Sequence, residues 1–166
     1  MLKNRLIPNI ILNNGNIVQS INFKHTNVIG NAITAVDFFN SWVVDEIIIL
    51  DVSRTDENRE MFHKIINGLS KRCFVPLTVG GWIKNLNDIR QLLNEGADKI
   101  SINTEAVKNP NLIKTSSNTF GSQCIVVSID VKKNKNNIHE VYIDRGRKNT
   151  GMNIVKWSKE VEALGA

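Results

Sequence analysis

The stretch Asp98-Lys99-Ile100-Ser101-Ile102-Asn103-Thr104 decides the fold of this chain, because a short β-branched run ends there in an amide and a hydroxyl. Two further runs end in a similar way, in Thr78-Val79-Gly80-Gly81 and in Ser128-Ile129-Asp130. If these runs are parallel strands, a carboxylate, an amide, a hydroxyl and bare backbone meet at one edge of a sheet. That edge is where proteins built from parallel strands and helices place their chemistry.

Strands and helices are expected to alternate along the whole chain. Apolar runs predict strands at 6–12, 46–51, 74–79, 99–102 and 123–129. Apolar residues at helical spacing predict helices at 31–42, 56–69, 86–94 and 153–164, and a further helix begins at Thr104 and breaks at Asn109-Pro110. The polar segment 131–149 is expected to form a long loop or a small hairpin.

Apolar spacing also predicts which helix faces point inward. Met61, Ile65 and Leu69 are expected to face the core from one helix, and Val155, Val161 and Leu164 from the last one.

This alternation predicts an α/β fold with a parallel sheet and helical crossovers. It does not distinguish an open sheet from a closed barrel. Five strands are enough for an open sheet, whereas an eight-stranded barrel typically needs about 200 residues or more, and this chain has 166.

Composition and charge exclude several classes of protein. Hydrophobic residues make up 42% and charged residues 22%, which is typical of a globular domain. The net charge of +5 comes without a Lys/Arg block interleaved with aromatics, so we expect no nucleic-acid partner. The sequence shows no secretory signal and no membrane span, and no histidine pair has metal-ligand spacing. Cys73 and Cys124 lie far apart and adjoin apolar strand residues, which favours buried thiols in a reducing, cytoplasmic setting. We expect no cofactor.

Three groups at the strand ends are candidates for chemistry. Gly80-Gly81 lets backbone N–H groups approach an anion, although ordinary turns use the same pair. Asn103-Thr104 opens a helix, so it binds a phosphate or simply caps the helix. Asp130 follows an apolar run and is a candidate general acid or base; its alternative role is to cap a loop or pair with Lys132.

Charged residues at the strand starts form a second group. Arg5, Glu46 and Lys99 each lie at or near the start of a predicted strand. In a barrel these starts share one face, so the three charges could meet there. An ion network that only stabilises this face is the alternative, because that face usually serves stability.

Aromatic and histidine side chains give weaker signals. The three histidines, at 25, 63 and 139, are expected at the surface. Trp42 and Trp157 are expected to pack in the core or between helices, whereas Trp82 directly follows the glycine pair and is awkwardly placed for an anion site.

A set of motifs runs in order along the whole chain. The motifs are Arg5-Leu6-Ile7-Pro8, Asp45-Glu46, Leu50-Asp51, Thr78-Val79-Gly80-Gly81, Gly96 to Thr104, Phe120-Gly121-Ser122-Gln123, Val127-Ser128-Ile129-Asp130 and Lys148-Asn149-Thr150-Gly151. In this order they resemble the cyclase subunit family of imidazole glycerol phosphate synthase. The resemblance implies a (β/α)8 TIM barrel of which residues 1–166 form a single, incomplete domain with about the first five β/α units.

The resemblance also implies a function in histidine biosynthesis. The family takes ammonia from a partner glutaminase and forms imidazole glycerol phosphate and an aminoimidazole carboxamide ribonucleotide. The site residues that it implies are Asp130 for catalysis, Gly80, Gly81, Asn103 and Thr104 for a substrate phosphate, Arg5, Glu46 and Lys99 for a gate through which ammonia enters, and Asp98 for the glutaminase interface.

The chain also departs from the family pattern. Ile11 stands where the family has its other catalytic aspartate, and an isoleucine cannot transfer a proton. Trp82 replaces a third glycine, and Gln19 replaces a loop lysine. The sequence ends at Leu164-Gly165-Ala166, where the family continues into a sixth strand.

Three hypotheses follow from these departures. The first is a cyclase-type subunit of the parent family. The second is a related branch that serves glutaminase-dependent amidation of surface sugars, which Ile11 favours and which Asn22-Phe23-Lys24 also resembles. The third is an inactive fragment or glutaminase-binding module, which Trp82 and the missing half favour.

Overall fold

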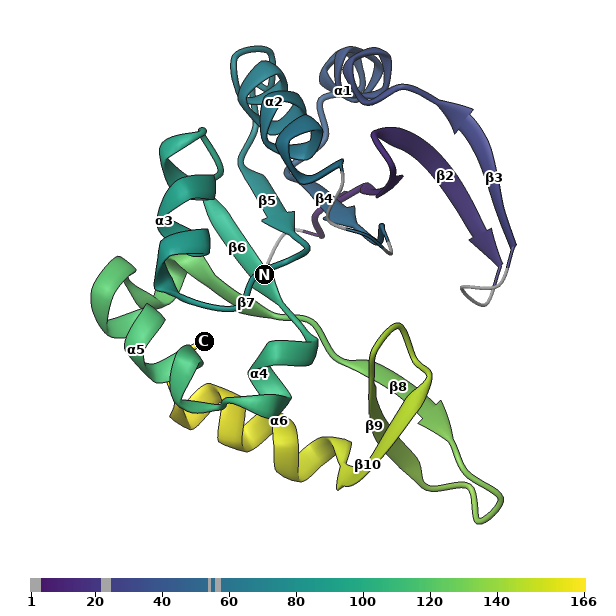
Figure 1. The fold of residues 1–166 in the computed structure, drawn as a ribbon, viewed down its shortest axis with the longest axis vertical. Helices are drawn as coiled ribbons and strands as arrows, with labels where there is room; N and C mark the ends of the chain where they lie inside the picture. The colour runs from purple at the N-terminus through teal and green to yellow at the C-terminus, as the bar shows by residue number, and fades with distance from the viewer. Residues whose placement is uncertain (1–3, 22–24, 54, 56–57) are drawn as a thin grey trace. The chain divides into compact units, whose positions relative to one another are not determined.

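The structure, a computed structural model, describes residues 4–21, 25–53, 55 and 58–166 (Figure 1). It divides into two compact units. The first contains Met1–Trp82 and Asn87–Ile100, and the second contains Ile83–Leu86 and Ser101–Ala166. The prediction that residues 1–166 form one domain therefore stays a prediction. The motif Asn22-Phe23-Lys24 and the predicted helix start at Asp56 lie outside the described residues.

The first unit is a sheet with helices packed on it. Its strands lie in the order β3-β2-β1-β4-β5. The bounds are β1 Asn9–Asn13, β2 Asn16–Ile21, β3 His25–Gly30, β4 Ile47–Asp51 and β5 Leu77–Gly80. Strands β1, β4 and β5 are parallel, with Ile10 opposite Ile49 and Ile49 opposite Val79. The predicted α/β fold with a parallel sheet is thus confirmed.

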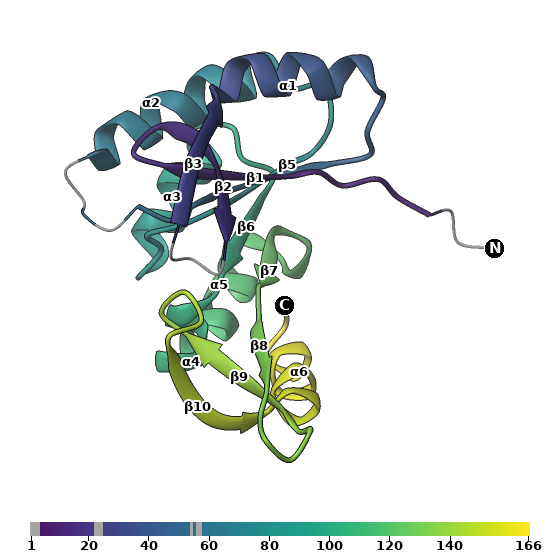
Figure 2. The ribbon, with the colours of Figure 1, turned by 90° about the vertical axis from the view of Figure 1, so that its right-hand side faces the viewer.

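Helices connect the parallel strands. They are α1 Ala32–Ser41, α2 Arg59–Ser70 and α3 Leu86–Asn94, of which α1 and α2 lie side by side (Figure 2). Strand β6, Lys99–Ile102, begins in the first unit and ends in the second. The largest fully buried side chains of the first unit are those of Leu12, Ile47, Ile49, Ile66, Leu69, Leu77, Ile89, Leu92 and Ile100.

The second unit combines helices with a small antiparallel sheet. Its elements are α4 Thr104–Lys108, α5 Asn111–Phe120, a 3-10 helix Ser122–Cys124, β7 Ile125–Val127, β8 Asp130–Lys133, β9 His139–Ile143, β10 Lys148–Asn153 and α6 Ile154–Ala163. The sheet order is β10-β9-β8, and α6 packs on β9 and β10 (Figure 2). Ser128 N donates to Ile102 O, which places β7 beside the end of β6.

The sequence missed the antiparallel ribbon β2–β3. Its strands contain no long apolar run that would predict them. The ribbon also leaves the apolar residues Val28 and Ile29 about two thirds exposed, at 65% and 64%. The hairpin expected within 131–149 is present as β8 and β9, and β10 adds a third strand.

Two predicted helix faces were right only in part: Leu69 and Val161 are buried as expected, and the other predicted residues are not. In α2 the buried residues are Phe62, Ile66 and Leu69, whereas Met61 is exposed. In α6 Trp157 and Val161 are buried, whereas Val155 is exposed. Apolar residues lie on both sides of the true stripe in each helix, so spacing alone could not choose between neighbouring faces.

Candidate functional site

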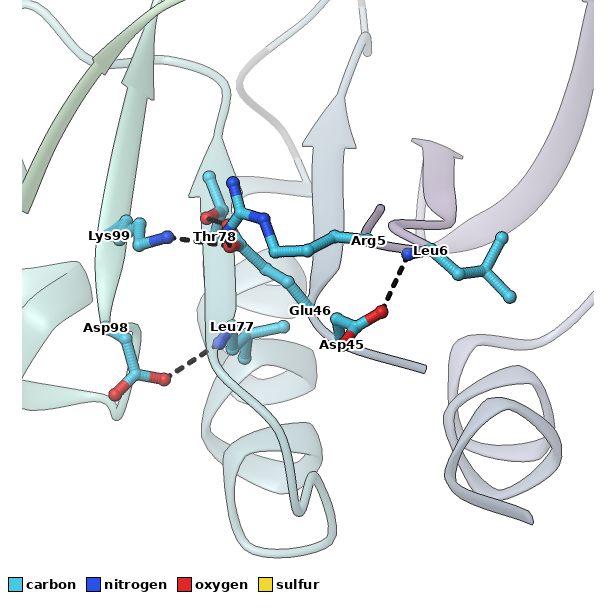
Figure 3. A network of polar contacts seen from close by, with 8 residues as sticks. All are labelled: Arg5, Leu6, Asp45, Glu46, Leu77, Thr78, Asp98 and Lys99. Atoms are coloured by element: carbon cyan, nitrogen blue, oxygen red, sulfur yellow. Dashed lines mark hydrogen bonds and ion pairs between the residues drawn. The ribbon is translucent and has the colours of Figure 1, made fainter. Parts of the chain in front are cut away.

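A buried carboxylate organises the start of the parallel sheet in the first unit. Glu46, which is 5% exposed, precedes β4. Its Oε2 accepts a hydrogen bond of 2.6 Å from Lys99 Nζ, and its Oε1 accepts one of 2.6 Å from Thr78 Oγ1 (Figure 3). Arg5 Nη1 lies 3.5 Å from the same Oε2. We call Arg5, Glu46, Thr78 and Lys99 the charged cluster.

Two aspartates hold the backbone beside this cluster. Asp45 Oδ2 accepts from Leu6 N at 2.7 Å, while Asp45 N donates to Leu6 O at 3.0 Å. Asp98 Oδ2 likewise accepts from Leu77 N at 2.8 Å, while Asp98 N donates to Leu77 O at 2.8 Å. In each case the aspartate directly precedes a cluster residue and is hydrogen-bonded to the backbone of a neighbouring segment, as Figure 3 shows.

The environment of Glu46 keeps it ionised. Burial pushes the pKa of Glu46 up, but hydrogen bonds from Lys99 and Thr78 and the positive charges of Lys99 and Arg5 outweigh burial and lower the pKa overall. A buried carboxylate is held ionised only where such donors surround it. The charged cluster therefore carries one negative and two positive charges.

The structure brings together Arg5, Glu46 and Lys99, which the sequence had selected as one group. It adds Thr78, which the sequence missed. In the parallel register Ile48 lies opposite Thr78, so Glu46, two residues earlier, points to the same side of the sheet. Thr78 is recognised only from this register, which the structure supplies. Asp98 does not join the cluster, because its side chain is bound to the backbone of β5.

The carboxyl end of β5 is closely packed in the first unit. Gly81 has φ +119, and a Cβ there would lie 2.7 Å from Asp51 O. Trp82 has φ +61, and its indole Nε1 donates to Asp51 Oδ2 at 3.1 Å. Asp51 Oδ1 accepts from Ser53. Gly81 is therefore needed for its close approach to Asp51, and the Trp82 indole is held by the same carboxylate.

Asp130 lies in the second unit together with Asn103 and Thr104. Asp130 is the first residue of β8. The predicted strand 123–129 was too long, since β7 covers only Ile125–Val127. The Asp130 carboxylate accepts hydrogen bonds from the Asn103 side chain and from Gly146 N. Burial raises the pKa of Asp130, although these two donors and Lys132 oppose the rise.

Asn103 and Thr104 stand at the start of α4. Asn103 is the N-cap residue, yet its side chain makes no capping hydrogen bond. Thr104 is the first helical residue, and its Oγ1 accepts from Asp144 N at 3.0 Å. The capping alternative therefore does not explain either side chain. Gly80 and Gly81 belong to the first unit, and the phosphate role of all four residues stays a prediction.

The raised pKa of Asp130 makes a prediction about stability. Because the folded chain binds this proton more tightly than the unfolded chain, ionising Asp130 lowers stability as pH rises from the acid range. The variant Asp130→Asn keeps an oxygen acceptor and has no charge to bury. We expect urea unfolding to show the variant gaining stability relative to the parent chain between about pH 3 and pH 7. A difference that does not change with pH would contradict the raised pKa.

Other side chains correct expectations about burial. His63 is not at the surface, since its side chain is 13% exposed and its Nδ1 lies 2.7 Å from Glu95 Oε2. The thiols of Cys73 and Cys124 are free and half-buried, and burial raises the pKa of Cys73. Trp42 is 60% exposed, whereas Trp157 is buried as expected.

Metal and membrane sites can be judged for the described part of the chain. Within it no group of three His, Cys, Asp or Glu side chains could hold a metal ion. Also within that part, no helix has the length and apolarity that crossing a bilayer requires.

The parallel strands of this chain start at a buried ion cluster and end in glycines and polar residues. This arrangement is typical of the class of β/α-repeat proteins, which carry functional groups at the ends of their strands. The chain belongs to the histidine biosynthesis protein family, which it matches over residues 5–166.

Curated relatives carry one recurrent name. Imidazole glycerol phosphate synthase subunit HisF of Clostridium botulinum (strain Langeland) is 42% identical over all of this chain and 66% of its own length. The subunit HisF of Lactococcus lactis subsp. cremoris (strain SK11) is 43% identical over all of this chain and 64% of its own. A putative imidazole glycerol phosphate synthase subunit, hisF2, of Vibrio vulnificus is 47% identical over all of this chain and 61% of its own.

These matches confirm the family resemblance that the motifs predicted. They also show that the chain spans slightly less than two thirds of the length of these relatives.

Proposed function

We propose that the chain is part of a cyclase-type subunit of imidazole glycerol phosphate synthase, which uses ammonia from a partner glutaminase in histidine biosynthesis. The observation that carries the proposal is the charged cluster, in which one buried carboxylate is held by Lys99 and Thr78 and approached by Arg5. The relatives are named as subunits of imidazole glycerol phosphate synthase, which supports the enzyme, and the ammonia and the glutaminase come from the family resemblance.

The charged cluster suits a gate for ammonia. Ammonia both donates and accepts hydrogen bonds, so it can replace a neighbour of Glu46 while that neighbour moves away. Arg5 is the outer member, since its side chain is 59% exposed and its contact with Glu46 is the longer one, at 3.5 Å. Lys99 and Glu46 form the inner pair, at 2.6 Å. In the proposal, Arg5 moves first and Lys99 opens the path.

The other predicted site residues complete the proposal at the opposite ends of the strands. Asp130 acts as general acid or base, and its raised pKa suits that role. Gly80, Gly81, Asn103 and Thr104 bind a phosphate of the substrate. The free thiols of Cys73 and Cys124 support a cytoplasmic location.

The proposal includes a (β/α)8 barrel of which this chain forms about the first five units. Exposed apolar residues on α1 and at its C-cap support it, with Ile33 46%, Phe38 51% and the C-cap residue Trp42 60% exposed. In a closed barrel each helix lies between two neighbours. The additional length of the relatives is enough to provide the missing neighbour of α1.

A second candidate function is glutaminase-dependent amidation of a surface sugar. Ile11 favours it, because this half-buried residue of β1 cannot act as the second proton-transfer group of a cyclisation. Losing one general acid or base typically lowers a rate by about 10² to 10⁴. Under this candidate the ammonia route persists while the acceptor differs.

Two assays test the proposal. In the first, the chain is mixed with glutaminases from the same organism and glutamine hydrolysis is measured; stimulation by one of them is expected. In the second, ammonium salts replace the glutaminase and imidazole glycerol phosphate is measured. Turnover supports the cyclase reaction, and its absence together with glutaminase stimulation supports the sugar candidate. Failure to bind or stimulate any glutaminase would overturn both.

Asp98 provides a prediction about the partner surface. We expect the glutaminase to dock on the face that bears the charged cluster and Asp98. Asp98→Lys should weaken its binding by several kcal/mol in order of magnitude, because it places a cation where the partner is expected to supply one. The matched control is Asp98→Asn, which retains an oxygen for Leu77 N and should bind within about 1 kcal/mol of the parent. Titration calorimetry measures both, and equal affinity of Asp98→Lys and the parent would place the interface elsewhere.

A further inference from the structure

The turn between β9 and β10 has an unusual backbone in the second unit. Asp144, Arg145 and Gly146 have φ of +54, +58 and +69, so three consecutive residues are left-handed. Such conformations are unfavourable for residues with a Cβ. Arg147 N donates to Ile143 O at 3.1 Å, which closes the turn but does not fix its position.

Three contacts outside the turn fix its position. Asp144 N donates to Thr104 Oγ1 at 3.0 Å. Gly146 N donates to the Asp130 carboxylate, and Gly146 O accepts from Lys132 Nζ. A strained turn that makes such contacts on its own sheet is a candidate for a functional role.

Lys132 and Asp130, which both lie on β8, contact the same residue, Gly146. They are two positions apart on β8, so their side chains leave the same face of the sheet. The Asp130 carboxylate accepts from the N–H of Gly146, and Lys132 Nζ donates to the carbonyl oxygen of Gly146. Gly146 suits this arrangement, because a Cβ there would lie 3.2 Å from Lys132 Cε. The Lys132 ammonium is itself placed 4.8 Å from the centre of the Tyr142 ring.

We propose that Lys132 is a positioning residue, which holds the Gly146 turn so that its N–H stays on the Asp130 carboxylate. The inference rests on the proposed catalytic role of Asp130. Without the Lys132 contact the left-handed turn is free to relax, and Asp130 loses one of its two hydrogen-bond donors. The Asn103 side chain then remains as its hydrogen-bond donor.

The test uses Lys132→Met, which keeps an apolar stem and removes the donor and the charge. Two signals are followed by NMR: hydrogen exchange of the Gly146 amide and the titration of the Asp130 carboxyl. We expect Gly146 exchange to accelerate by about tenfold or more, and the Asp130 titration to move to higher pH, because a donor and a positive charge are lost. Loss of the Lys132 charge by itself also raises the Asp130 titration, so the shift supports the positioning role only when Gly146 exchange accelerates with it.

Matched variants make the test decisive. Lys133→Met removes the neighbouring lysine, whose side chain leaves the opposite face of β8, and should change neither signal. We call the contact of Lys132 with Gly146 the clamp. Lys132→Arg keeps a donor and a positive charge, so it should retain most of the Gly146 protection, and it is measured in place of Lys132→Met if that variant fails to fold. Protection of Gly146 like that in the parent chain then supports the clamp, whereas a loss of protection equal to that in Asp130→Asn overturns it. Parent-like values of both signals in Lys132→Met would also overturn it.

The activity of the complex separates the two proposals. If Lys132→Met changes both NMR signals while Asp130→Asn leaves ammonia-dependent turnover of the complex unchanged, the proposed role of Asp130 fails and the clamp stands. If Asp130→Asn abolishes turnover while Lys132→Met changes neither signal, the clamp fails and the proposed function stands.

Discussion

Replacing Glu46 with leucine is expected to destabilise the chain by roughly 3 kcal/mol, because one partner of a buried ion pair is removed. Lys99, whose side chain is 27% exposed, would keep its charge without the carboxylate. Thr78, which is 1% exposed, would lose the acceptor of its hydroxyl. Both losses leave a desolvated polar group without its partner, and this accounts for the size of the effect. Urea unfolding followed by circular dichroism measures it.

A double variant separates the pair from the packing around it. Glu46→Leu together with Lys99→Leu should recover most of the lost stability, since an apolar pair can replace a buried ion pair at little cost. The exposed pair of Arg72 and Asp37, whose side chains are 55% and 49% exposed, is the matched control. Asp37→Asn should change stability by less than about 1 kcal/mol. If Glu46→Leu costs no more than this control, the charged cluster behaves as a surface ion pair.

The second large effect is expected at Trp157 in the second unit. This residue of α6 is 1% exposed, and Trp157→Ala should cost about 3–5 kcal/mol, because it opens a large cavity in the core of the second unit. Its indole Nε1 is buried and has no hydrogen-bond partner among the described residues. Trp157→Phe should therefore cost only about 1 kcal/mol or less, since the loss of volume is offset by removing an unsatisfied donor.

Near-ultraviolet spectra and unfolding curves of these variants provide the check. Trp42, which is 60% exposed, is the matched surface control, and Trp42→Ala should lose less stability than Trp157→Ala by a wide margin. Equal losses at Trp157→Phe and Trp157→Ala would mean that the indole N–H has a partner after all and contributes to stability.

Much of the fold could be predicted because its signals are local. The helix 86–94 and the strand 99–102 were predicted at their observed bounds, since an amphipathic period and a β-branched run depend only on residues close together in the sequence. The ribbon β2–β3 could not be predicted in this way, because its strands are supported by pairing with each other and leave apolar residues exposed.

The candidate site shows the same division. Arg5, Glu46 and Lys99 could be grouped from the sequence, because parallel strands place their starts together. The inclusion of Thr78, which lies 32 positions from Glu46, depends on the register between β4 and β5. Local sequence does not encode that register.

By itself the sequence determined the parallel β/α order, the family, and the chemical types available at each end of the strands, because these depend on neighbouring residues and on motif order. Only the tertiary structure decided which of those groups touch. It placed Gly81 against Asp51, turned the Trp82 indole to the same carboxylate, and surrounded Asp130 with Asn103 and Gly146. The physical reason is that burial, hydrogen bonds and the resulting pKa shifts arise from residues brought together across the fold.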